Sequence, residues 1–286
     1  MPATYAHWRF GDDCLKTLPQ DLANIVNKHR DIFNYGTQGP DIFFFYKAIS
    51  PNEVNKYGSD FHKKPCKEIL RIFKEGYSKT KDKDSALSYI IGFICHFNLD
   101  SHCHNYIEKA CDETVFTHAR IETQLEKRLM IKDGKDPIKT RLSSIFHPTK
   151  AIASTISDLY GHYDDKIVYR SIVDYSKCLD LLKYDNKIKR NFIVKLMKKV
   201  KADNFLGLLM NNEEYIGIET ILLRLEKLYE KALKRYQELA VNVYNYINDK
   251  EELNDFFNRT LDKEEGYKSI PFFTLEEEEN YIVEKF

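Results

Sequence analysis

"SYIIGFICHFNLDSHCH" (residues 88–104) joins a nearly continuous apolar run to three histidines and an aspartate. The run is part of a segment, residues 84–110, whose pattern predicts one long helix. Because an α-helix turns about 100° per residue, residues four apart lie about 40° from each other. His96, Asp100 and His104 therefore share one helix face, whereas His102 points roughly to the opposite side.

A second histidine–carboxylate pair follows in "HARIE", where His118 and Glu122 are four residues apart on the next predicted helix, 113–131. Zinc takes nitrogen from histidine and oxygen from aspartate or glutamate, and a bundle core can assemble such a site from facing helices. One pair alone is typical of ordinary surface pairing. Two pairs on consecutive helices, the first within an apolar stretch where a buried carboxylate needs a partner, favour a metal site.

Three further stretches could supply ligands: "YAHWRFG" with His7, "GPDIFFFY" with Asp41 and "DFHKKP" with His62. Taken alone, Asp41 would be a helix N-cap, His62 a surface histidine and His7 a core or capping histidine. None of the three indicates a metal by itself.

Composition excludes several classes of protein. The 286 residues include 44 Lys plus Arg and 44 Asp plus Glu, so no overall field favours nucleic acid or an anionic membrane. We therefore expect no stable nucleic acid complex. The six cysteines form no CxxC pair and are interpreted as reduced thiols. No apolar run of about 18 residues and no secretory signal is visible, so we expect no transmembrane segment and a cytoplasmic location.

The predicted fold class is all-α, since Gly and Pro are few and apolar residues recur at helical spacing. We predict a metal-binding helical core (1–131), a helical part packed on it (148–250) and an acidic tail (251–286), with "KDGKDPIK" at 132–139 as the main boundary. The predicted helices are 12–31, Pro65 to about Gly76, 84–110, 113–131, 149–160, 165–183, 186–201 and 213–248.

Two of these segments and the tail have unusual patterns. The basic helix 186–201 could bind anionic lipid, but a core-packing helix with a solvated basic back is favoured. The long helix 213–248 could be a coiled-coil arm, but packing within the domain is favoured because its heptads are irregular. The glutamate run in "LEEEEN" is interpreted as a solvated tail.

Taken in order, "YAHWRFG", "GPDIFFFY", "FHKKP", "GFICHFNLDSHCH" and "HARIE" resemble the zinc-dependent phospholipase C family, over about residues 1–125. Its superfamily includes fungal single-strand nucleases. The resemblance implies a multi-helix bundle of that type, with additional C-terminal helices, that holds up to three zinc ions in one cleft. It implies one zinc on Asp41, His62, His96 and Asp100, a second on His104, His118 and Glu122, and a third on His7 with Asp100 as a bridge.

The chain departs from secreted members of the family, which complete the third site with an N-terminal tryptophan. Here Trp8 follows His7. Either the N-terminus folds back, or another group or water completes the site, or the third metal is weak or absent. We therefore expect two to three zinc ions.

The resemblance implies hydrolysis of a phosphoester by activated water, with Asp41 as a candidate general base and a phospholipid headgroup ester as substrate. A nucleotide phosphodiester is the second candidate substrate. The non-enzyme alternative is a helical scaffold with structural zinc. Aromatic residues near the ligands, such as Phe43, Phe44, Phe45, Tyr46 and Phe61, could line a substrate pocket, but a core role is favoured.

Overall fold

The computed structural model describes residues 4–48, 50–182, 191, 193–195 and 203–283. These residues form helices and no strand, so the predicted all-α class is confirmed. The helices are α1 (Thr4–Leu15), α2 (Gln20–Lys28), α3 (Arg30–Gly36), η1 (Gly39–Phe43), α4 (Glu53–His62), α5 (Cys66–Lys79), α6 (Lys83–Glu113), α7 (His118–Lys132), η2 (Leu142–Ile145), α8 (Lys150–Tyr160), α9 (Asp165–Leu182), η3 (Asp203–Leu208), α11 (Ile218–Ile247), η4 (Asp255–Asn258), η5 (Tyr267–Ser269) and α12 (Leu275–Asn280).

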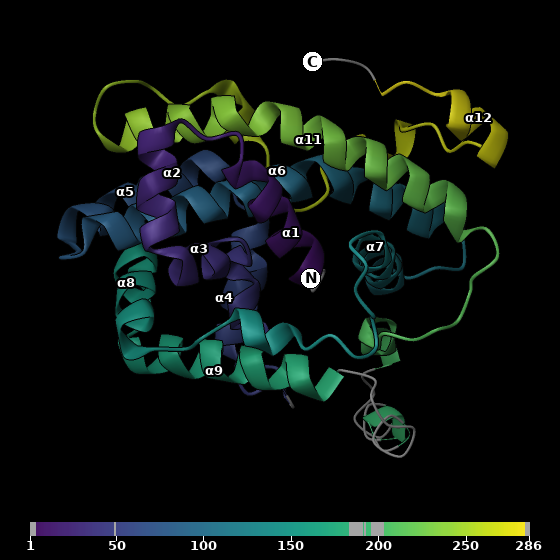
Figure 1. Ribbon diagram of the computed structural model, residues 1–286, viewed down its shortest axis with the longest axis horizontal. Coiled ribbons are helices and arrows are strands. Elements are labelled where there is room, and N and C mark those ends of the chain that lie inside the picture. Colours follow the sequence, from purple (N-terminus) through teal and green to yellow (C-terminus); the bar gives the residue numbers. More distant parts are fainter. Residues whose placement is uncertain (1–3, 49, 183–190, 192, 196–202, 284–286) are drawn as a thin grey trace.

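Helix α6 is the central element, and α3 and α11 pack most extensively against it (Figure 1). Its first turn is capped by Asp82, whose side chain accepts a hydrogen bond from the backbone N–H of Ser85 at 3.0 Å. From Ser85 to His104 every side chain of α6 is buried. A helix that is apolar nearly all round can be stable only when other helices surround it.

Helix α11 packs within this bundle, as favoured from its sequence. Figure 1 shows α11 running alongside α6, and the hydroxyl of Tyr236 donates to the carbonyl of Ile91 at 3.2 Å. The helix begins at Ile218, five residues later than predicted. The predicted helix 186–201 falls largely outside the described residues.

The prediction of a single helix over 12–31 is wrong. Helix α1 starts earlier, at Thr4, and ends at Leu15, and α2 begins after Pro19. Proline has no N–H for a helix interior and its ring collides with the preceding turn, so it starts a helix instead of continuing one. Pro65 has the same role before α5, where the prediction is confirmed.

The residues after α11 are packed against the bundle. Phe257 and Leu261 are fully buried, and Glu278 is buried in an ion pair with Arg224. The interpretation of the glutamate run as a solvated tail is therefore wrong at Glu278, while Glu276, Glu277 and Glu279 are exposed.

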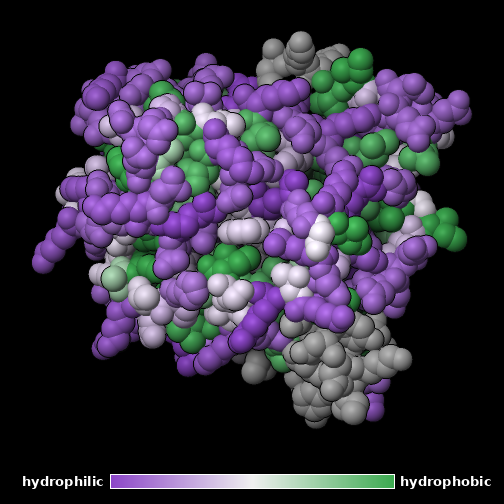
Figure 2. All heavy atoms as spheres, viewed as in Figure 1, coloured by the Kyte–Doolittle hydropathy of each residue, from purple (hydrophilic) through white to green (hydrophobic). Residues whose placement is uncertain are grey.

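Hydrophilic side chains predominate on the face shown in Figure 2, where hydrophobic side chains form small separate groups. Of the aromatic residues near the candidate ligands, Phe43, Phe45 and Phe61 are buried in the core, as favoured, and Phe44 is half-buried beside His62 with ring centroids 5.1 Å apart. Within the described part of the chain, no helix has both the length and the apolarity needed to cross a membrane.

Candidate metal centre

Helix α6 carries three of the ligand candidates on one face, at four-residue steps. His96, Asp100 and His104 have exposed fractions of 0%, 2% and 5%. Since the helix is surrounded by other helices, this spacing places an aligned row of two imidazoles and a carboxylate in the protein interior.

The Asp100 carboxylate lies at the junction of three imidazoles. Its Oδ1 atom is 3.2 Å from Nε2 of His7 and 3.4 Å from Nε2 of His104, and its Oδ2 atom is 3.1 Å from Nε2 of His96. Burial alone would raise the pKa of Asp100, but the neighbouring histidines hold it well below its ordinary value. Asp100 is therefore a carboxylate, and α1 contributes His7 to the same point as α6.

Asp41 and His62 reach the α6 row from η1 and α4. Oδ1 of Asp41 is 2.9 Å from Nε2 of His62, and the His62 and His96 rings have centroids 5.9 Å apart. The side-chain amide of Asn55 on α4 donates to the carbonyls of Phe43 and others in the turn after η1, at 2.9 Å for Phe43. This contact ties α4, which carries His62, to the end of η1, which carries Asp41, and to the turn after it.

The N-terminal turn of α7 supplies the remaining pair. Thr117 caps the helix, and His118 and Glu122 follow on one face with Nε2 and Oε1 3.2 Å apart. The same Glu122 oxygen lies 3.5 Å from Nε2 of His104 on α6. Helices α6 and α7 thus face each other across this cluster.

All eight residues singled out from the sequence fall into three groups whose ligand atoms lie within 4.8 Å of one another. The groups are His7–His96–Asp100, Asp41–His62–His96 and His104–His118–Glu122. His96 belongs to two of them, and Asp100 faces His104 of the third. The structure therefore brings together residues from α1, η1, α4, α6 and α7 that are up to 115 positions apart.

The spacing of these atoms fits zinc. Ligands about 2.0–2.1 Å from a tetrahedral zinc lie about 3.3 Å from each other. The nitrogen–oxygen distances within the cluster run from 2.9 to 3.5 Å. The buried Nε2 atoms of His96 and His104 make no hydrogen bond with any described residue, although they face carboxylate oxygens.

The tautomers also fit. The Nδ1 atoms of His62, His96 and His104 face backbone carbonyls of Gly58, Thr37 and Leu261 at 2.8, 3.2 and 2.5 Å. A carbonyl can only accept, so each Nδ1 carries a proton, and Nε2 is the ring atom left to bind a metal when the imidazole is neutral. A histidine held in this way is ready to bind a metal through Nε2.

His118 is held by a carboxylate in place of a carbonyl. Its Nδ1 donates to Oε1 of Glu108 at 2.7 Å. Burial lowers the pKa of His118, but Glu122 and Glu108 outweigh it and raise that pKa to about 9. The bond to His118 lowers the pKa of Glu108 to about 2. Glu108 therefore stays ionised and increases the basicity of the His118 ring.

The residues that orient the histidines were not identified from the sequence. Glu108 continues the four-residue spacing of His96, Asp100 and His104, so the pattern contained a signal for it. Thr37, Gly58 and Leu261 act through backbone carbonyls, which no residue type encodes.

His102 lies outside the three groups, in keeping with its predicted direction. Its Nδ1 atom faces the carbonyl of Asn98 at 2.7 Å and its ring lies 5.4 Å from that of Phe256. Burial lowers the pKa of His102 to about 4, so it is neutral at physiological pH.

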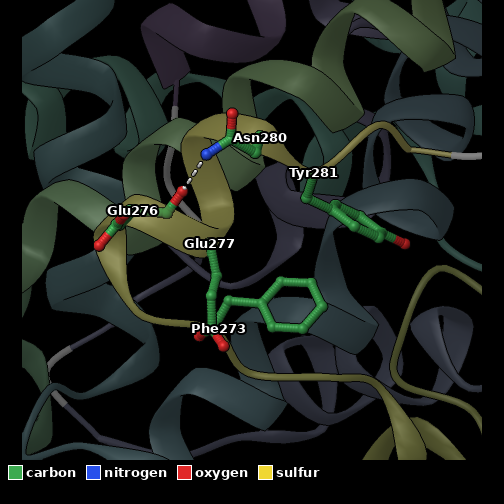
Figure 3. A pocket seen from close by; sticks show the side chains of 5 residues that line it. All are labelled: Phe273, Glu276, Glu277, Asn280 and Tyr281. Carbon is green, nitrogen blue, oxygen red and sulfur yellow. Dashed lines mark hydrogen bonds between the residues drawn. The ribbon is translucent and has the colours of Figure 1, made fainter.

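A shallow surface pocket around α12 is separate from this cluster (Figure 3). The side chains that line it are Phe273, Glu276, Glu277, Asn280 and Tyr281, none of which is a ligand candidate.

No curated protein and no solved structure shows significant similarity to the chain. The family model described as zinc dependent phospholipase C matches residues 6–198, which is more than half of the chain and includes all eight candidates. The family and the three ligand groups together support a zinc-dependent hydrolase. The chain belongs to the zinc-dependent phospholipase C family.

Proposed function

We propose that the chain is a phospholipase C-like phosphoester hydrolase in which the eight candidates hold two to three zinc ions. The observation that carries the proposal is the convergence of histidine Nε2 atoms and carboxylate oxygens at 2.9 to 3.5 Å in a member of this family. Bound zinc would polarise the phosphoryl oxygen and acidify water.

We assign the general-base role to Asp41. Burial alone would raise the pKa of Asp41, but His62 and His96 beside it favour the charged form, and the pKa lies below its ordinary value. Asp41 is therefore ionised at neutral pH. Its lowered pKa makes it a weak base, and water acidified by bound zinc would need only a weak base to accept its proton. His62 contacts the same carboxylate at 2.9 Å and fixes its position.

Substrate would approach from the N-terminal end of α7. His118 has a side-chain exposed fraction of 29%, against 10% or less for the other seven candidates. A buried centre with one accessible edge suits a phosphate group that projects from a larger molecule, as in a phospholipid headgroup ester.

The first experiment is the zinc content of untagged protein by elemental mass spectrometry, together with hydrolysis of short-chain phosphatidylcholine. We expect two to three zinc ions per chain, turnover that chelator abolishes, and recovery when zinc is returned. His118→Ala and Glu122→Ala should each lower the zinc content, while His102→Ala should not. Asp41→Asn should reduce turnover about 10²–10⁴-fold.

Three results distinguish the alternatives. Faster turnover of a dinucleotide than of any phospholipid would replace the substrate with a nucleotide phosphodiester. A zinc-loaded protein that hydrolyses neither, and that unfolds in chelator, would be a scaffold with structural metal. Equal zinc in the His118, Glu122 and His102 variants would remove the ligand assignment.

A further inference from the structure

Residues 259–267, here called the C-terminal segment, lie beyond the part of the chain that matches the family model and yet contact the metal centre. The segment follows η4 and is anchored on both sides. The carbonyl of Arg259 accepts from the N–H of Cys66 at 2.8 Å, and the hydroxyl of Tyr267 donates to Asp112 at 3.0 Å. Its backbone therefore runs from the start of α5 to the end of α6.

Leu261 joins two of the ligand groups through its backbone. Its N–H donates to the carbonyl of His62 at 3.1 Å, and its own carbonyl accepts from Nδ1 of His104 at 2.5 Å. His62 belongs to the group around Asp41, and His104 to the group around Glu122. The Leu261 side chain is fully buried, so this backbone position is fixed by packing.

Lys263 is linked to His118 through Glu108. Its Nζ atom is 2.6 Å from Oε2 of Glu108, and Oε1 of the same carboxylate accepts from Nδ1 of His118 at 2.7 Å. The adjacent N–H of Glu264 donates to the side chain of Asn105 at 2.7 Å, which holds the segment along α6. A lysine, a carboxylate and a candidate ligand thus form one continuous chain of contacts.

We propose that the C-terminal segment is a positioning element of the metal centre. The Leu261 carbonyl fixes the tautomer and ring direction of His104, and the Lys263–Glu108 pair does the same for His118. The inference rests on the metal centre of the proposed function. Hydrogen bonds that orient metal ligands influence metal affinity, and their loss lowers that affinity about 10–100-fold.

The first test compares two α6 glutamates that each form an ion pair with a lysine. Glu108→Ala removes the acceptor for His118. Glu113→Ala removes a pair with Lys109, 2.5 Å across, which no ligand candidate contacts. Zinc dissociation constants are measured by chelator competition on the full chain. We expect one class of zinc site to weaken about 10–100-fold in Glu108→Ala and no change in Glu113→Ala.

The second test loosens the segment at two fully buried side chains. Leu261→Ala and Phe257→Ala both remove core volume, but only Leu261 carries the carbonyl bonded to His104. The measurements are zinc affinity, the visible spectrum of the cobalt-loaded protein and the denaturation midpoint. We expect both variants to lose stability, and only Leu261→Ala to change the spectrum and the affinity.

Wild-type zinc binding separates the two proposals. If wild-type protein binds no zinc, the proposed function fails and the inference falls with it. If wild-type protein binds zinc, and Glu108→Ala and Leu261→Ala bind it as tightly, the inference alone is wrong.

Discussion

A Cβ atom on Gly39 would lie 2.7 Å from Cδ2 and 3.2 Å from Nε2 of His96, so only glycine leaves space for this imidazole. Gly39 also has a φ of +52°, which favours glycine. We predict that Gly39→Ala displaces the His96 ring and lowers zinc content, because His96 belongs to two ligand groups. Elemental analysis of the purified variant is the measurement.

Gly134→Ala is the matched control for that change. Gly134 has a φ of +67° with nothing within 4 Å of the added Cβ, so the variant has the same backbone strain, about 1–2 kcal/mol, without the contact to His96. We expect it to keep its zinc. Equal zinc in both variants would mean that the ring tolerates the added atom.

Helices α3 and α6 cross at backbone contact, and this crossing should be sensitive to one methyl group. A Cβ on Gly92 would lie 2.4 Å from the carbonyl oxygen of Phe33 and 3.0 Å from Cα of Gly36. Gly92→Ala should therefore destabilise the protein by about 1–3 kcal/mol or more, as overpacked cores do. Helix propensity alone predicts a gain of about 1 kcal/mol. Urea denaturation distinguishes the two expectations, because overpacking lowers the free energy of unfolding and helix propensity raises it.

The buried ion pair between Arg224 and Glu278 should be costly to break on one side. Nε and Nη2 of Arg224 lie 2.7 and 2.6 Å from the two carboxylate oxygens, and the side-chain exposed fractions are 4% and 0%. Glu278→Gln or Arg224→Met should each cost about 3–5 kcal/mol.

Removing both charges provides the control for that pair. Arg224→Met combined with Glu278→Leu removes both charges of this pair, and the part-buried Lys227, 3.4 Å from Glu278, keeps its hydrogen bonds to the carbonyls of Glu278 and Tyr281. The double variant should therefore be more stable than the sum of the two single losses. Arg141→Met, which removes an exposed pair with Asp180, should change the denaturation midpoint little. If the stability lost by the double variant equals the sum of the two single losses, Arg224 and Glu278 are not coupled.

Glu126 should make stability depend on pH. Burial raises its pKa to about 8 from an ordinary 4.5, and its Oε1 accepts a hydrogen bond from the N–H of Tyr5. The folded state thus holds the proton more tightly, so the free energy of unfolding falls as pH rises from about 4.5 to 8, by about 1.4 kcal/mol per unit of pKa shift.

Glu126→Gln keeps the acceptor for Tyr5 and cannot ionise. We expect its denaturation midpoint to exceed that of the wild type at pH 9 and to match it at pH 5. A difference between the two proteins that stays constant across this range would show that folding does not raise the pKa of Glu126.

The sequence was sufficient to predict α6 and to select ligand candidates that the structure brings together. The α6 row depends only on helical periodicity and apolar flanks, which are local properties, so residues 84–110 were predicted close to the observed Lys83–Glu113. The error at 12–31 arose from ignoring Pro19, whose effect on backbone geometry is also local. His96, Asp100, His104, His118 and Glu122 were found through residue types and spacing. His7, Asp41 and His62 were added through the resemblance to the family, and the metal binding of all eight is still a prediction.

Contacts between residues far apart in the chain could not be predicted from the sequence. Glu278 is one of four consecutive glutamates, and only the position of Arg224, 54 residues away, distinguishes it from its exposed neighbours. The contact between Leu261 and His104 spans 157 residues and uses a backbone atom, so no side chain at position 261 indicates it.

The contact of Leu261 with both His62 and His104 has a consequence for biosynthesis. Chains are made from the N-terminus, and N-terminal parts begin to fold first. All eight candidates have been synthesised once Glu122 is added, whereas Leu261 follows 139 residues later. A nascent chain therefore contains every candidate ligand long before the carbonyl that orients His104 exists. If the C-terminal segment positions the centre as proposed, the fully oriented centre is a late product of translation, and zinc captured earlier would be bound by an immature site.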